Sequence, residues 1–213
     1  MEQKLTDRLK AGTREQHEAV ERGVDLDALA GSREAYLAHL CALWGVHAPL
    51  EARLARLDWA QVGVDFESRR RVELLRADIE ALAAEVDVEA LPTCERLAPV
   101  ETICPLETIW QGLGCLYVLE GSRLGGQMIA RALEERLGLR PERACRFLSS
   151  HGVRLGQSWK AFKSAVDCAG AEHPEHAATV VASANATFAS VQRWFEAGGH
   201  RAPREVAAGE DNP

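Results

Sequence analysis

The chain has 213 residues, of which 46% are hydrophobic and 27% are charged, a balance typical of a globular protein with one sizeable core. The net charge of -7 argues against a nucleic-acid-binding protein, because such proteins present a basic surface. The segment Met1–Glu18 is polar and charged and does not resemble a signal peptide, so we expect a cytoplasmic protein that does not enter a membrane.

Apolar residues that recur every three or four positions predict an all-α fold, with no strand and no internal repeat. The expected helices cover residues 5–23, 32–57, 67–86, 106–137, 150–166 and 174–197, with a loop over 87–105. Ser32 is the expected N-cap of the second helix, Gly138 ends the fourth, and Pro174 lies in the first turn of the last. Residues 1–197 are therefore expected to form one helical domain, followed by a flexible polar tail over 198–213.

The six cysteines are scattered along the chain and include no Cys-x-x-Cys pair. Without a secretory signal, this distribution favours reduced thiols used as small hydrophobic residues, and it disfavours both disulfides and a zinc site. The cysteines are Cys41, Cys94, Cys104, Cys115, Cys145 and Cys168.

The helix expected over 106–137 carries three glycines, Gly121, Gly125 and Gly126, in its middle. Each costs about 1 kcal/mol relative to alanine in a helix interior, so another interaction should compensate. Gly121 and Gly125 lie on one face of the helix, which is therefore bare of side chains. Either a neighbouring helix packs against this face, or a flat ligand lies across a helix that bends there.

The first helix places His17 on the side of the apolar residues Leu5, Leu9 and Val20, so we expect the imidazole to face the interior. A histidine in such a position is more often a core residue than a ligand. Lys10 lies two turns earlier on nearly the same face. Its ammonium group either meets an anionic group at the rim of a pocket or stays solvated with its stem packed down.

Several catalytic patterns are absent from the sequence. It contains no nucleophile elbow, P-loop, dinucleotide fingerprint or His-Glu-x-x-His, and the lack of Glu-x-x-His excludes a di-iron helical bundle. What remains is an inward histidine and a helix bared by glycines. An imidazole on one side and bare backbone on the other would suit a heme group, since the imidazole can bind the iron and the bare side leaves room for dioxygen.

With these features the chain resembles the heme oxygenase family over most of residues 5–197. The Glu-Gly-Ser part of the central motif is similar to that of bacterial members, particularly those that supply biliverdin to bacteriophytochromes. The resemblance implies a single-domain helical bundle with a glycine-kinked distal helix. It is carried by Leu9-Lys-Ala-Gly-Thr-Arg-Glu-Gln-His17, by Tyr117-Val-Leu-Glu-Gly-Ser-Arg-Leu-Gly-Gly-Gln127 and by Ala186-Thr-Phe-Ala-Ser-Val-Gln-Arg-Trp-Phe195.

The resemblance also implies roles for individual residues. His17 would be the proximal ligand of the heme iron, and Gly121 and Gly125 would contact the opposite, distal face of the heme. The remaining expected heme-binding residues are two aromatic contacts and three lysines for the heme propionates: Tyr117, Phe188, Lys10, Lys160 and Lys163.

One position departs from part of the family. Animal and some bacterial members carry an aspartate directly after the first distal glycine, where it orders the waters that protonate bound oxygen; here that residue is Ser122. Either Ser122 and nearby backbone carbonyls organise these waters, or Glu120 or Arg123 contributes. Glu120 is expected to point away from the glycine face, because adjacent helix positions differ in direction by about 100°.

The resemblance implies an enzyme that uses dioxygen to open heme b, both its cofactor and its substrate, to biliverdin with release of carbon monoxide and ferrous iron. Electrons would come from an external donor, such as ascorbate or a ferredoxin- or flavodoxin-type reductase, since the chain has no flavin or nicotinamide motif. Two other functions stay open. One is a non-catalytic heme carrier or sensor on the same fold, and the other is a heme-free helical protein of the related thiamin-salvage type.

Overall fold

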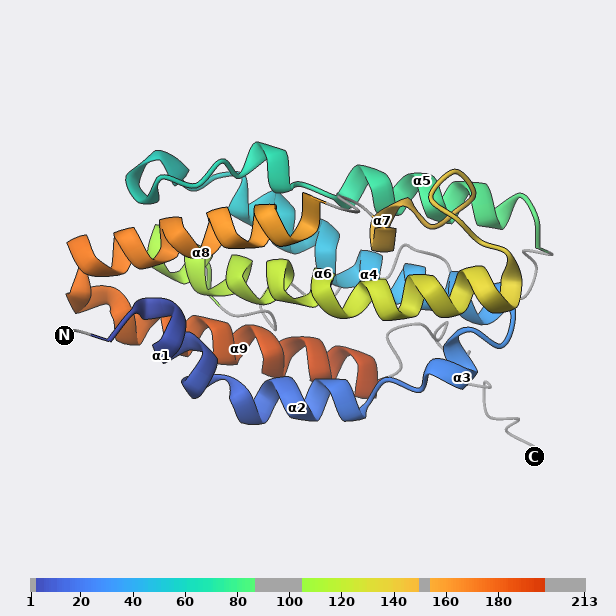
Figure 1. Ribbon diagram of the computed structural model, residues 1–213, viewed down its shortest axis with the longest axis horizontal. Coiled ribbons are helices and arrows are strands. Elements are labelled where there is room, and N and C mark those ends of the chain that lie inside the picture. Colours follow the sequence, from blue (N-terminus) through green and yellow to red (C-terminus); the bar gives the residue numbers. More distant parts are fainter. Residues whose placement is uncertain (1–2, 87–104, 150–153, 198–213) are drawn as a thin grey trace, which may run out of the picture.

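The computed structural model describes residues 3–86, 105–149 and 154–197, and this part of the chain contains helices and no strand (Figure 1). The all-α prediction is confirmed. Most of the expected loop over 87–105 and all of the expected tail over 198–213 lie outside the described residues. The α-helices are α1 (Leu5–Gly12), α2 (Arg14–Arg22), α3 (Leu26–Leu29), α4 (Arg33–Leu54), α5 (Val72–Ala83), α6 (Ile109–Leu137), α7 (Arg146–Ser149), α8 (Leu155–Glu172) and α9 (Ala177–Glu196), with short 3₁₀ helices η1 (Trp59–Val62), η2 (Glu67–Arg69) and η6 (Pro174–His176).

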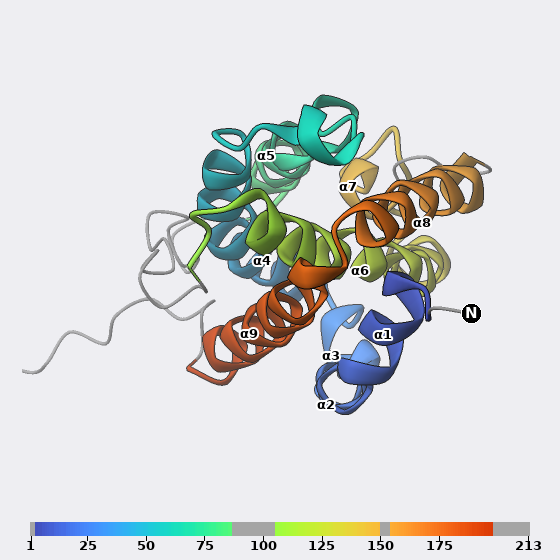
Figure 2. The ribbon, with the colours of Figure 1, turned by 90° about the vertical axis from the view of Figure 1, so that its left-hand side faces the viewer.

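The long helix α6 runs through the middle of the bundle, and the other long helices surround it (Figure 2). Its ends are fixed by local chemistry. At the start, Thr108 and Gln111 form a reciprocal capping box, and at the end Gly138 adopts a left-handed conformation with φ of 67°, which suits glycine. The predicted end at Gly138 is confirmed, as is the N-cap of α4, where the Ser32 hydroxyl accepts the N–H of Ala35 at 3.1 Å.

Two hydrophobic clusters hold the bundle together, and α6 contributes to both. The first gathers the N-terminal part of α6, up to Leu119, with α1, α8, α9 and the end of α4. The second gathers the C-terminal part, from Ile129 onward, with α5, α7 and the first half of α4. Within the described residues, no side chain from 120–128 belongs to either cluster. The middle of α6, which contains the three glycines, therefore lies between the two cores.

The largest differences from the predicted helix bounds concern three of the expected helices. The first expected helix is divided into α1 and α2 at Thr13, which is buried and whose hydroxyl donates to the Leu9 carbonyl at 2.8 Å. The third expected helix begins at Val72 instead of residue 67, after the separate turn η2. The helix α8 begins at Leu155 and continues to Glu172, because its last turns remain packed against α1.

Within the described residues, no helix has the length and apolar character that a bilayer crossing requires. The cysteines in this part, Cys41, Cys115, Cys145 and Cys168, carry thiols and form no disulfide with one another. The other two cysteines lie outside the described residues.

Candidate functional site

One face of α6 is open. At about 100° per residue, Tyr117, Gly121, Leu124, Gly125 and Met128 project to the same side of the helix. A Cβ atom added at Gly121 or at Gly125 would meet no atom within 4 Å. Beside them Leu124 is 43% exposed and Met128 is 68% exposed, which is unusual for large apolar side chains. We call these five residues the glycine face.

Other glycines of α6 show what close helix packing looks like. A Cβ at Gly114 would lie 2.2 Å from the backbone oxygen of Val180 on α9, and one at Gly126 would lie 3.3 Å from the Leu148 side chain. These two glycines allow neighbouring elements to approach. Gly121 and Gly125 do not, so helix packing does not explain them, and the flat-ligand hypothesis is favoured. The structure has α6 as one uninterrupted helix, and the expected bend at the glycines stays a prediction.

His17 does not face the interior as expected, and its side chain is 51% exposed. The reason is the break at Thr13, which takes the buried position and lets α2 start in a new direction. The imidazole meets the Phe188 ring of α9 edge-on, with ring centroids 5.9 Å apart. Its Nδ1 lies 3.5 Å from a carboxylate oxygen of Glu21, while Nε2 has no hydrogen-bond partner in the described part of the chain. The exposed nitrogen is therefore available to a ligand.

Aromatic side chains extend from the glycine face to α8. Tyr117 is half-buried, and its ring centroid lies 5.6 Å from that of Trp159. Burial raises the pKa of the Tyr117 phenol. The Lys163 ammonium lies 5.8 Å from the centroid of the Trp159 ring, so Lys163 belongs to the same group of residues. The exposed Lys10 and Lys160 form no ion pair within the described residues, and no contact ties them to this group.

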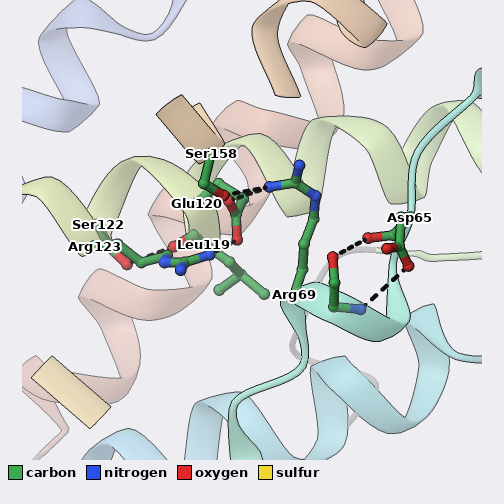
Figure 3. A network of polar contacts seen from close by, with 8 residues as sticks. Asp65, Arg69, Leu119, Glu120, Ser122, Arg123 and Ser158 are labelled. Carbon is green, nitrogen blue, oxygen red and sulfur yellow. Dashed lines mark hydrogen bonds and ion pairs between the residues drawn. The ribbon is translucent and has the colours of Figure 1, made fainter. Parts of the chain in front are cut away.

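A buried ion-pair network flanks the glycine face, and sequence reasoning missed it (Figure 3). The Glu120 carboxylate pairs with Arg69 Nη1 at 2.6 Å and with Arg123 Nη1 at 2.5 Å. The side chains of Arg69 and Glu120 are only 9% and 3% exposed. Arg69 Nη1 also lies 3.5 Å from the Ser158 hydroxyl on α8. The only signal in the sequence was a run of three arginines before α5, a pattern that more often marks a solvated surface.

Ser122 lies on the exposed side of α6, one position beyond Gly121. Its hydroxyl donates to the Leu119 carbonyl of its own helix at 2.8 Å. The oxygen keeps its capacity to accept a hydrogen bond. The direction expected for Glu120, away from the glycine face, agrees with its pairing to the two arginines.

A second buried polar layer lies beyond this network and anchors helix ends. Glu51 accepts the backbone N–H of Arg71 at 2.9 Å, and Asp78 accepts that of Phe147 at 2.7 Å. Burial raises the pKa of both carboxyl groups, lowers that of Arg71 to about 9 and lowers that of His47 to about 3. Since these groups hold α5 and α7 in place, we assign them to the fold.

The residues of the glycine face and of α2 fit a heme group in their chemistry. The bare backbone at Gly121 and Gly125 leaves the space that a Cβ would fill, and the exposed Leu124 and Met128 offer apolar contact to a flat ring. His17 offers an exposed imidazole nitrogen, which is a common heme-iron ligand.

Comparison with known proteins agrees with this fit. A family model described as heme oxygenase matches residues 3–197. Over 81 residues the chain is 40% identical to a protein named heme oxygenase from Xanthomonas campestris pv. campestris (strain 8004), and this match spans 37% of the chain and 42% of that relative.

Solved structures share the fold at lower identity. The heme oxygenase of Neisseria meningitidis, with NO and CO bound, has a TM-score of 0.75 at 22% identity over 99% of both chains. The heme oxygenase of Leptospira interrogans has a TM-score of 0.71 at 20% identity, over 92% of this chain and 100% of that one. Heme oxygenase 2 of Chlamydomonas reinhardtii, without heme, has a TM-score of 0.68 at 19% identity, over 94% of this chain and 100% of that one. Because the family model covers nearly the whole helical part, the chain belongs to the heme oxygenase family.

Proposed function

We propose that this chain is a heme oxygenase enzyme. It binds heme and uses dioxygen and external electrons to open the porphyrin ring to biliverdin, with release of carbon monoxide and ferrous iron. The observation that carries the proposal is the glycine face, on which a Cβ added at Gly121 or Gly125 would meet no atom within 4 Å and Leu124 and Met128 stay exposed. Membership of the heme oxygenase family supports it.

In this proposal His17 binds the iron of heme b through Nε2. The Glu21 carboxylate lies 3.5 Å from the other ring nitrogen, Nδ1, one turn along α2, where it could orient the imidazole. A carboxylate beside Nδ1 favours the tautomer that keeps its proton there, which would leave the Nε2 lone pair for the iron. Phe188 packs against the edge of the imidazole and limits its rotation.

Gly121 and Gly125 carry no side chain, so they would let the α6 backbone approach the bound ring closely. When bound, heme supplies the oxygen chemistry and is itself the molecule that is cleaved. Ser122 is our candidate for holding a water beside this site: its O–H donates to Leu119, and its lone pairs can accept from a water. Ser122 and the backbone carbonyls nearby would orient that water, and the water would deliver protons to the distal side.

Lysines are the proposed partners of the heme propionates. Lys163 is the best supported, because its ammonium approaches Trp159, which contacts Tyr117 of the glycine face. Lys10 and Lys160 are exposed and would reach the propionates only from the rim. We therefore expect Lys163→Met to weaken hemin binding more than Lys160→Met, a matched change one turn earlier on α8.

A hemin titration of the wild type and of His17→Ala tests the function. We expect a Soret band that depends on His17 and that decays, with reductant and air, to the absorbance of biliverdin with release of carbon monoxide. His173→Ala is the matched control, because His173 Nδ1 also lies 3.5 Å from a carboxylate, that of Glu175, on an exposed corner. Its titration should equal that of the wild type.

The other outcomes separate the remaining hypotheses. A His17-dependent band that does not decay would indicate a heme carrier or sensor. No such band would indicate a heme-free protein and refute the heme proposal. The electron donor, whether ascorbate or a ferredoxin- or flavodoxin-type reductase, stays a proposal, as do delivery of biliverdin to a bacteriophytochrome and a cytoplasmic location. Turnover with each donor and cell fractionation would test these points.

A further inference from the structure

The middle of α6 is held mainly by charged groups. Residues 120–128 add no side chain to the two hydrophobic clusters, and a Cβ added at Gly121 or Gly125 would meet no atom within 4 Å. Yet this segment must keep a defined position if it limits the space beside a bound ring. The contacts available to fix it are those of Glu120 and Arg123, together with the close approach of Gly126 to Leu148.

Glu120 connects the segment to two other parts of the fold. Through Arg69, at 2.6 Å, it is tied to the turn η2, and through the Arg69 contact with Ser158, at 3.5 Å, to α8. The Arg69 guanidinium also lies 5.0 Å from the centroid of the Phe162 ring on α8. Arg69 thus links the turn η2 to both α6 and α8 (Figure 3).

The turn that carries Arg69 is itself fixed. Asp65 accepts the backbone N–H of Ser68 at 3.2 Å, and the Ser68 hydroxyl donates to the Asp65 carbonyl at 3.1 Å. Asp65 and Ser68 are therefore hydrogen-bonded to each other across the turn directly before Arg69 (Figure 3). These two hydrogen bonds favour one backbone conformation of the turn, which helps Arg69 to hold its partner in one position.

The two charged residues of α6 lie beside the glycines in the sequence. Glu120 directly precedes Gly121, and Arg123 lies midway between Gly121 and Gly125. Around the helix the two charged side chains point about 100° and 160° away from Gly121, so they leave the glycine face uncovered. Ion pairs that are buried depend strongly on geometry, since neither charge can return to water.

We propose that Arg69, Glu120 and Arg123 form a clamp of positioning residues that fixes the rotation of the Gly121–Gly125 segment relative to the bound heme. This inference rests on the proposed function. The clamp residues act through the backbone of α6 and touch neither the substrate nor the reacting atoms. Through this rotation they control how fast the ring is opened and which meso carbon is attacked.

The first test uses the heme-free protein and amide hydrogen exchange. In Arg69→Met, which leaves Glu120 paired with Arg123, we expect exchange over 119–126 to rise about tenfold or more while the two ends of α6 stay protected. Arg69→Lys should restore part of the protection. The control is Arg136→Met on the same helix: Arg136 pairs with Asp27 at the same 2.6 Å, but the pair is exposed.

The second test uses the heme complex of the same variants and of Glu120→Gln. Hemin affinity should stay within about threefold of the wild type, because His17 is untouched, while the rate of ring opening falls several-fold. The ratio of biliverdin isomers should shift, and Arg69→Lys should move it back toward the wild-type ratio. Arg136→Met should change neither the rate nor the ratio.

Three results would overturn the clamp. They are unchanged exchange over 119–126, a rise spread evenly over all helices, and a local rise with wild-type rate and isomer ratio. The last two would make the network a contribution to stability only. Failure of the proposed function is distinct, because it would show as the absence of a His17-dependent Soret band in the wild type itself.

Discussion

Replacing Gly121 by alanine should stabilise the protein without heme and impair it with heme. The added Cβ would meet nothing within 4 Å, so no clash opposes the change. Alanine in a helix interior is favoured over glycine by about 1 kcal/mol. For a chain of this length that gain raises the midpoint of thermal unfolding by about 2–4 °C. Gly125→Ala should behave in the same way.

The same methyl group should weaken the function, because it fills space on the face proposed to lie against heme. We expect the rate of ring opening, hemin affinity, or both to fall by about tenfold, equivalent to about 1.4 kcal/mol. A single methyl group would thus shift heme-free stability and function in opposite directions. Few surface substitutions do so, since most change stability by less than about 0.5 kcal/mol.

Thermal unfolding of the heme-free variants and hemin titration of the same samples provide the assay. Gly114→Ala is the control, because its Cβ would lie 2.2 Å from the Val180 carbonyl on α9. Overpacking of this kind costs about 1–3 kcal/mol, so the unfolding midpoint should fall. If Gly121→Ala also lowered the midpoint, Gly121 would be a packing glycine, and the argument from an open face would be refuted.

Three further predictions follow from single contacts. Burial lowers the pKa of His47 to about 3, so in acid the unfolded chain binds a proton at His47 that the folded protein does not, and the contribution of His47 to the free energy of unfolding should be about 2 kcal/mol lower at pH 5 than at neutral pH. Denaturant titrations of His47→Leu at both pH values should lack this loss, and equal losses in variant and wild type would contradict the assignment. Glu21→Gln should weaken hemin binding up to about tenfold by loosening the His17 imidazole, and unchanged affinity would show that Glu21 does not orient the ligand. Gly45→Ala places a Cβ 2.3 Å from the buried Trp194 ring and should destabilise the protein by about 1–3 kcal/mol, with a change in tryptophan fluorescence; wild-type stability would mean that the ring can shift at no cost.

Local chemistry in the sequence was sufficient to predict two helix ends, the start of α4 at Ser32 and the end of α6 at Gly138. The Ser32 hydroxyl and the Gly138 backbone each act within one turn, so their effect does not depend on distant residues. The break at Thr13 could not be predicted in this way. Threonine is compatible with a helix interior, yet Thr13 leaves helical geometry, with φ of -111° and ψ of 3°, and is buried. The exposure of His17 is a consequence of that break.

The site could be predicted only in part, for a related reason. Glycine spacing was sufficient to single out Gly121 and Gly125, because a helix face without side chains is a property of the sequence itself. The pairing of Glu120 with Arg69 joins residues 51 positions apart, and no local pattern encodes it. A charge within a helical sequence is normally taken to be solvated, so the burial of these groups was unpredictable without the fold.

The placement of charges in the middle of α6 follows from competing demands on that segment. Apolar side chains fix the two ends of the helix in separate clusters, but large apolar residues around the middle would also require a neighbouring element to cover them. Such an element would compete for the face that a flat ring needs. Ion pairs on the far flank hold the segment from one side only and leave the face at Gly121 and Gly125 open. The glycines cost about 2 kcal/mol of helix stability between them, so a segment without the clamp would be the weakest part of α6. Local exchange at this segment is therefore the observable most sensitive to the loss of Arg69.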